Sequence, residues 1–135
     1  MKYRILIVSA NYYTDISNNL LKDTKTTLKS KAKYQVINVP GVFEIPVIIA
    51  KNIKKYHGFI ALGCVIKGET PHFDFISNTT INAIMNLSIV NKKPIGNGIL
   101  TCLDKKQAEA RSGSLNKVGK GIEAAKAVLS VLNNF

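Results

Sequence analysis

The sequence lacks several features that would assign it to a familiar class at once. It has no run of about 18 consecutive apolar residues, which excludes a transmembrane helix. The apolar run at 5–10 is shorter than a signal-peptide core and has no cleavage signature, so we expect a cytoplasmic protein. The motifs GxxxxGKS, GxxxxGKT and GxSxG are absent, and Gly96 and Gly98 are followed by Thr101 where a dinucleotide fingerprint has its third glycine.

Cysteine and histidine are scarce and widely spaced. Cys64 and Cys102 are the two cysteines, and both lie inside apolar runs with no CxxC spacing. This pattern predicts reduced thiols in the interior of strands, and it argues against a disulfide framework and against a cysteine nucleophile. The two histidines, His57 and His72, are far apart and no third ligand stands at metal spacing, so we expect no metal ion.

Acidic residues and arginine are both few, although the chain is strongly basic. Eight Asp and Glu stand against 19 Lys and Arg, which gives a net charge of +11, and only Arg4 and Arg111 are arginines. Lysine, isoleucine and asparagine are the residues that an A/T-rich coding sequence supplies, and reading of base edges favours arginine. We therefore expect no nucleic-acid partner, and a basic nucleic-acid binder stays a rival class that steep salt dependence would reveal.

Strand and helix patterns alternate along all 135 residues, with no repeat and no linker, which predicts a single domain over 1–135. The predicted strands are 3–9, 34–39, 59–66 and 95–103. The predicted helices are 16–28, 45–56, 74–90, a short one from Asp104 to about Gly113, and 117–133. This order is typical of an α/β protein with a four-stranded parallel sheet and helices on both faces.

Residues able to do chemistry follow the first three strands. Ligands of an open parallel sheet bind outside the carboxyl ends of its strands. Tyr12 and Tyr13 follow the first strand, and they either stack on a planar ring or cover the edge of the core. Glu44 follows the second strand, where it either binds a ligand or interacts with the dipole of the next helix.

The loop after the third strand has the composition of an anion site. Gly68 allows close approach of a ligand, Lys67 adds positive charge, and the loop leads into a helix N-terminus. Thr70 offers a hydroxyl to a phosphate or caps the helix, and these two interpretations stay open. His72 is either a proton-transfer group beside that site or a surface histidine that caps the helix.

Three segments resemble one enzyme family. VPGVFEIP at 39–46, ALGCVIKGETPHFDFI at 61–76 and KGIEAA at 120–125 are similar to the 6,7-dimethyl-8-ribityllumazine synthase family, in the family's order. The resemblance implies a flavodoxin-like three-layer α/β/α sandwich, assembled as a homopentamer or a multiple of pentamers. It also implies the penultimate step of riboflavin biosynthesis, with small-molecule substrates and no cofactor. Riboflavin synthase is a further partner that it implies.

The resemblance also implies roles for individual residues. The ribitylaminouracil substrate would contact nine positions: Tyr12, Val42, Phe43, Glu44, Val65, Ile66, Lys67, Asn97 and Lys120. The butanone phosphate would contact four positions: Gly68, Glu69, Thr70 and Arg111. His72 would transfer protons, and Arg111 would reach the phosphate from an adjacent subunit.

The sequence departs from the family pattern in three places. Asn11, Tyr12 and Tyr13 stand where the family usually has Arg-Phe-Asn, and Asn97 stands where many members have an aromatic residue. The stretch between Arg111 and Lys120 is one residue longer than in some members, so Lys117 rivals Lys120 as the lysine near the pyrimidine. A non-catalytic flavodoxin-like module that binds a phosphorylated small molecule is the alternative function.

Overall fold

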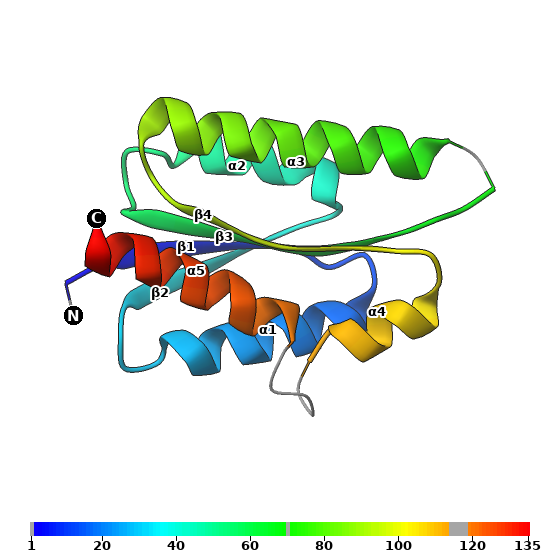
Figure 1. Cartoon of the computed structure of the whole chain (residues 1–135), viewed down its shortest axis with the longest axis horizontal. Coiled ribbons are helices and arrows are strands. Elements are labelled where there is room, and N and C mark those ends of the chain that lie inside the picture. Colours follow the sequence, from blue (N-terminus) through cyan, green and yellow to red (C-terminus); the bar gives the residue numbers. More distant parts are fainter. Residues whose placement is uncertain (1, 70, 114–118) are drawn as a thin grey trace.

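The computed structural model describes residues 2–69, 71–113 and 119–135, and within them one sheet lies between two layers of helices (Figure 1). Its four strands are β1 Arg4–Ala10, β2 Lys33–Val39, β3 Gly58–Ile66 and β4 Ile95–Cys102. They are ordered β2-β1-β3-β4 and every neighbouring pair is parallel. The carboxyl ends of all four strands therefore lie at the same edge of the sheet.

Helices cover both faces of the sheet. One face carries α1 Thr14–Leu28, α4 Lys105–Arg111 and α5 Lys120–Asn134 (Figure 1). The other face carries a 3-10 turn, Val42–Glu44, with α2 Ile45–Lys51 and α3 His72–Asn91. This arrangement confirms the predicted flavodoxin-like three-layer class. Among the described residues, no helix combines the length and the apolar character that a membrane crossing needs.

The apolar runs in the sequence form the two inner strands, β1 and β3. In β1, Ile5 and Ile7 pack into the core layer under α1 and α5, while Leu6 and Val8 pack into the layer under α2 and α3. All four side chains are fully buried, because helices cover the strand on both sides. Both faces of such a strand are apolar, which explains why its sequence shows no alternation.

Several helix boundaries differ from the sequence prediction, and the last helix, expected from about 117, begins at Lys120. The second helix was expected to reach residue 56, but α2 ends at Lys51. Asn52 ends it, because its side-chain amide donates to Ile48 O at 2.8 Å and its backbone N–H donates to Ile49 O. The loop after β3 was expected to extend through residue 73, but α3 begins at His72, with Asp74 N donating to Pro71 O.

Gly96 of β4 allows α5 to lie close to the sheet. A Cβ on Gly96 would lie 2.5 Å from Ala124 O of α5, whereas a Cβ on Gly98 would lie 2.5 Å from Leu62 Cδ2 of β3 and 3.4 Å from the Cβ of Ala124. The distance at Gly96 is shorter than atoms in contact allow, so only glycine permits this close packing of α5 on β4.

Candidate active site

The topology of the sheet defines where a ligand should bind. β1 is followed in sequence by β2 on one side, and β3 is followed by β4 on the other. The chain thus leaves the neighbouring strands β1 and β3 in opposite directions, which leaves a crevice between their carboxyl ends. The loops after β1 and β3 flank this switch point.

A cavity of about 290 Å³ lies at the switch point, and we call it the switch-point cavity. Its lining comes from β1, β2, β3 and α3 and their connections: Tyr12, Tyr13, Gly41, Val42, Cys64, Val65, Ile66, His72 and Ile76. Five of the predicted site residues are among them: Tyr12, Val42, Val65, Ile66 and His72. One concave, mainly apolar surface therefore joins residues that are 60 positions apart in the sequence.

Tyrosines after β1 form one wall of this cavity. Tyr12 is 75% exposed, and its ring centre lies 4.9 Å from that of Tyr13 in an edge-to-face arrangement. Burial raises the pKa of the Tyr13 hydroxyl, and Cys64 and Tyr12 add to this shift. Because most of its surface is exposed, the Tyr12 ring is accessible for stacking on a flat ligand.

The 3-10 turn after β2 supplies a second wall. A Cβ on Gly63 of β3 would lie 2.5 Å from Val42 Cγ1, so Val42 packs directly on the strand backbone. The backbone of the turn is closed by a hydrogen bond from Glu44 N to Gly41 O, at 3.2 Å. The Glu44 carboxylate folds back towards Gly41, so that a Cβ placed on Gly41 would lie 3.2 Å from Glu44 Oε1. Phe43 is 57% exposed on the outside of the turn.

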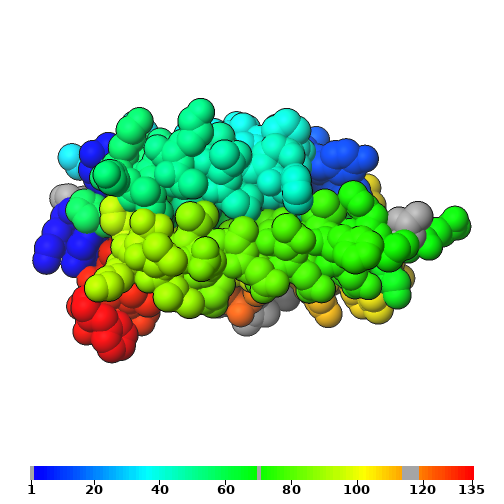
Figure 2. Space-filling model, turned by 90° about the horizontal axis from the view of Figure 1, so that it is seen from above, coloured from blue at the N-terminus to red at the C-terminus, as the bar shows by residue number. Residues whose placement is uncertain are grey.

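The third wall follows β3. Lys67 N donates to Cys102 O at 2.9 Å, which ties the start of the loop to β4. Lys67, Gly68 and Glu69 are exposed, and Figure 2 shows the green segment after β3 projecting from the end of the molecule. His72 is exposed as the first residue of α3, where N–H groups of the first turn attract an anion.

A second cavity, of about 300 Å³, lies along the edge strand, and we call it the cation cavity. It is lined by residues of β4, α4 and α5: Ile99, Leu100, Thr101, Arg111, Lys120 and Glu123. Arg111 ends α4, whose start is capped by Asp104, because its carboxylate accepts from Gln107 N at 2.8 Å. Arg111 and Lys120 belong to different helices, and this cavity brings their charges together.

Two buried cysteines lie near these cavities. Cys64 lines the switch-point cavity, and Cys102 interacts with Cys64 and with the Arg111 guanidinium of the cation cavity. Burial raises the pKa of Cys64 to about 12, and burial also raises that of Cys102, although Arg111 opposes the shift. Both thiols are protonated near neutral pH, which argues against a nucleophilic role. Within the described residues, no group of three or more His, Cys, Asp and Glu could hold a metal ion.

Several predicted site residues line neither cavity: Phe43, Glu44, Lys67, Gly68, Glu69 and Asn97. Asn97 is exposed on β4, and its side-chain oxygen accepts from Ile99 N at 3.0 Å. Thr70 lies outside the described residues, and so does Lys117, the rival of Lys120. Sequence reasoning missed Cys64, Ile76 and Thr101 as lining residues, since nothing in a strand or helix pattern marks which apolar position faces a cavity.

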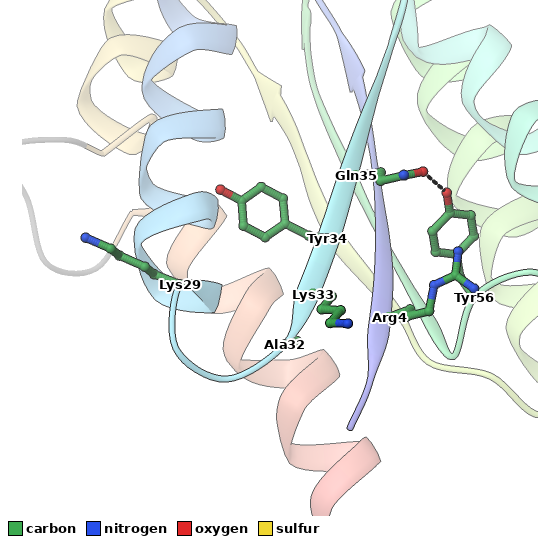
Figure 3. A pocket seen from close by; sticks show the side chains of 7 residues that line it. All are labelled: Arg4, Lys29, Ala32, Lys33, Tyr34, Gln35 and Tyr56. Carbon is green, nitrogen blue, oxygen red and sulfur yellow. Dashed lines mark hydrogen bonds between the residues drawn. The ribbon is translucent and has the colours of Figure 1, made fainter. Parts of the chain in front are cut away.

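A third cavity, with a volume of about 420 Å³, lies at the opposite end of the sheet (Figure 3). We call it the amino-end cavity, and its lining is Arg4, Lys29, Ala32, Lys33, Tyr34, Gln35 and Tyr56. Tyr34 and Gln35 point to opposite sides of β2, and Tyr56 OH donates to Gln35 Oε1. Arg4 lies over the Tyr56 ring, 5.2 Å from its centre. No predicted site residue lies here, and open parallel sheets bind ligands at the other edge.

The fold and the two cavities at the carboxyl edge define an α/β protein that binds small molecules at the switch point of a parallel sheet. Comparison with known proteins identifies the family. The family model described as 6,7-dimethyl-8-ribityllumazine synthase matches residues 2–135. A protein of that name from Bartonella henselae is 44% identical over 99% of this chain and 91% of its own length. One from Agrobacterium fabrum is 44% identical over 97% of this chain and 93% of its own length.

The chain belongs to the 6,7-dimethyl-8-ribityllumazine synthase family. It is therefore an enzyme, a transferase of riboflavin biosynthesis, and this confirms the resemblance drawn from 39–46, 61–76 and 120–125. The match covers nearly the whole chain, including both cavities, and the non-catalytic alternative is not favoured.

Proposed function

We propose that the chain performs its reaction in a cleft shared by two copies, with the switch-point cavity of one copy facing the cation cavity of the next. The reaction condenses 5-amino-6-(D-ribitylamino)uracil with 3,4-dihydroxy-2-butanone 4-phosphate. It yields 6,7-dimethyl-8-ribityllumazine, phosphate and water. The observation that carries the shared cleft is the division of the predicted residues between two cavities with no lining residue in common.

The switch-point cavity is suited to the ribitylaminouracil. Tyr12 presents an exposed ring for stacking on the pyrimidine, and Val65 and Ile66 line the crevice beside it. The ribityl chain then runs along the turn after β2, past Val42 and Phe43 to the Glu44 carboxylate, which accepts hydrogen bonds from its hydroxyl groups. In the shared cleft, Asn97 and Lys120 of the neighbouring copy close the pyrimidine side.

The butanone phosphate would lie between the start of α3 and the cations. Gly68, Glu69 and Thr70 would cradle the phosphate with their backbone, beside Lys67 and the N–H groups at the start of the helix. Arg111 of the neighbouring copy supplies a planar pair of donors, the geometry that binds phosphate most strongly. Positive charge around the leaving phosphate stabilises it as its bond to carbon breaks.

The chemistry uses proximity and one proton-transfer group. The primary amine of the pyrimidine attacks the butanone carbonyl, and loss of water gives an imine. Elimination of phosphate leaves a second carbonyl group, and attack of the ribityl-bearing nitrogen on that carbonyl closes the second ring with loss of a second water. Holding both substrates in one cleft makes the first step effectively unimolecular. His72, at the mouth of the switch-point cavity, accepts and returns the protons that these steps move.

Exposed apolar side chains support assembly into a ring. On the face formed by the 3-10 turn, α2 and α3, six large apolar side chains are between 55% and 68% exposed: Phe43, Val47, Phe75, Met85, Ile89 and Val90. Figure 2 looks onto this face, with α2 and α3 side by side. Burial of that surface would offset repulsion between subunits of charge +11. We propose a cytoplasmic homopentamer with head-to-tail contacts, with riboflavin synthase as a downstream partner.

A two-substrate assay on the purified chain tests the reaction. Mixing ribitylaminouracil with butanone phosphate should produce the absorbance of the lumazine product, and neither substrate alone should do so. Light scattering on the same sample should give the mass of a pentamer or of a multiple of pentamers. A pure, folded protein that forms no lumazine would contradict the proposed reaction, and an active monomer would contradict the shared cleft.

A further inference from the structure

Two glycines at the ends of the connection between α4 and α5 lie against each other. Gly113 follows α4 and has φ +97°, a left-handed conformation that side chains disfavour. Gly119 precedes α5, and a Cβ placed on it would lie 2.7 Å from the Cα of Gly113. The chain therefore leaves α4 and enters α5 at nearly the same point. Arg111 stands two residues before that point, and Lys120 stands directly after it.

One carboxylate of α1 occupies the space that the two glycines leave. A Cβ on Gly113 would overlap Oδ2 of Asp23, and a Cβ on Gly119 would lie 2.9 Å from the same oxygen. Asp23 is buried, with 9% of its surface exposed. A buried carboxylate is costly unless other groups compensate its charge, so an aspartate here indicates a specific contact rather than core filling.

Polar groups beside Asp23 on α1 hold the same connection from both sides. Asn19 Nδ2 donates to Ser112 Oγ at 3.3 Å, on the α4 side. Thr24 Oγ1 lies 3.4 Å from Gly121 O, on the α5 side, while its main acceptor is Leu20 O at 2.8 Å. Each of these contacts reaches one side of the connection, whereas Asp23 Oδ2 fills the space beside both glycines, so Asp23 is the central group of the three.

We propose that Asp23 is a positioning residue for the reaction: its carboxylate holds Gly113 and Gly119 together and so sets Arg111 and Lys120 in one cavity. The inference rests on the proposed roles of Arg111 and Lys120. Asp23 itself lies on the α1 side of the connection and does not line the cation cavity. Its removal should act on catalysis only through the placement of the two cations, and small misplacement of a binding group is costly.

The first test is a set of variants on α1. Asp23→Ala should raise the KM for butanone phosphate about tenfold and change kcat less, because the substrate contact is misplaced while His72 is untouched. Asp23→Asn keeps the shape and one oxygen, so it should show a smaller rise. Asp15→Asn makes the same chemical change at an exposed position of the same helix and should leave the KM unchanged. The thermal unfolding midpoint of each variant checks that it is folded. If Asp23→Ala does not fold, Asp23→Asn replaces it in the measurement.

The decisive test is a double-mutant cycle with Arg111→Ala. If Asp23 acts through Arg111, adding the Asp23 substitution to Arg111→Ala should change the KM for butanone phosphate by less than about twofold. Two results would overturn the inference and leave the proposed function intact. In one, the increases in KM caused by the two substitutions multiply in the double variant. In the other, Arg111→Ala raises the KM but the Asp23 variants do not. An unchanged KM in Arg111→Ala itself would instead overturn the role of Arg111, and this inference with it.

Discussion

The switch-point cavity and the cation cavity are built in different ways. The first lies at the ends of β1 and β3, which are paired in register and buried on both faces, and its lining is mostly apolar and aromatic. The second lies beside the edge strand β4, and its charged groups come from the end of α4 and the start of α5. In the proposed function, the flat ring is therefore bound at the ends of inner strands, whereas the phosphate depends on Arg111, which stands at the end of a short helix.

This difference predicts that the two substrates respond to separate sets of substitutions. Changes in the switch-point cavity should affect the chemistry and the ribitylaminouracil, and loss of Arg111 from the cation cavity should affect mainly the butanone phosphate. Each of the following substitutions tests that division. An effect on one substrate supports it, and an equal loss of binding for both substrates contradicts it.

His72→Ala should have the largest effect, because it removes the proposed proton-transfer group. We expect a fall in kcat of about a hundredfold, with little change in the binding of butanone phosphate. Steady-state kinetics at saturating concentrations of both substrates measures this. His57→Ala is the matched control, since His57 is exposed at the amino end of the sheet, where its ring nitrogen accepts from Arg4 N at 3.0 Å. An unchanged kcat in His72→Ala would remove the role.

Arg111→Ala should have the second-largest effect, on the binding of butanone phosphate. It should raise the KM for butanone phosphate about tenfold to a hundredfold, the range that loss of hydrogen bonds to a charged group gives. The KM for ribitylaminouracil should rise much less. Arg4→Ala removes the other arginine of the chain, which lies at the amino-end cavity, and should leave both KM values unchanged. Equal rises for both substrates in Arg111→Ala would argue against a phosphate clamp.

Glu44→Ala should have a moderate effect on one substrate. Loss of the carboxylate should weaken the binding of ribitylaminouracil by a few-fold to about tenfold, which is the contribution of one or two hydrogen bonds. The binding of butanone phosphate should be almost unaffected. Calorimetry with each ligand alone makes the measurement. The control is Glu109→Ala, which removes an exposed carboxylate of α4. If both ligands weaken equally in Glu44→Ala, the substitution has damaged the fold instead.

Alkaline pH should have the smallest effect, on stability rather than on activity. The pKa of Cys64 is raised from 9.0 to about 12, because burial disfavours the thiolate. Above pH 9 the unfolded chain loses this proton while the folded chain keeps it, so stability falls as pH rises towards about 12. Urea midpoints should therefore fall more steeply over this range in the native chain than in Cys64→Ala. If the urea midpoints of the two proteins fall in parallel as the pH rises, the buried thiol does not contribute to the pH dependence of stability.

The sequence was sufficient to predict the sheet and the first half of the site. The runs at β1 and β3 are apolar throughout, and their carboxyl ends must meet at one edge of a parallel sheet, so the proximity of Tyr12, Val42, Val65 and His72 could be expected. The helix over 45–56 was predicted too long, because the apolar spacing continues past Asn52 although the side chain of that residue ends α2.

The second half of the site depends on contacts that no local pattern contains. Arg111 and Lys120 were predicted from family resemblance, but in our proposal their joint placement rests on Gly113, Gly119 and Asp23, which is far from both glycines in sequence. Gly96 of β4 gives α5 room to approach the sheet, a role that the strand pattern does not indicate. A buried aspartate on an otherwise amphipathic helix is the one signal that could have pointed to this contact.

The shared cleft is the central claim, and complementation between two damaged proteins tests it most directly. His72→Ala and Arg111→Ala chains are dissociated, mixed in equal amounts and reassembled, and mass tags verify that the rings are mixed. If each cleft takes His72 from one copy and Arg111 from its neighbour, about a quarter of the clefts contain both residues. Activity at low butanone phosphate should then recover to about a quarter of the native value. Verified mixed rings that stay as inactive as either parent would contradict the account, because each copy would then hold its own complete site.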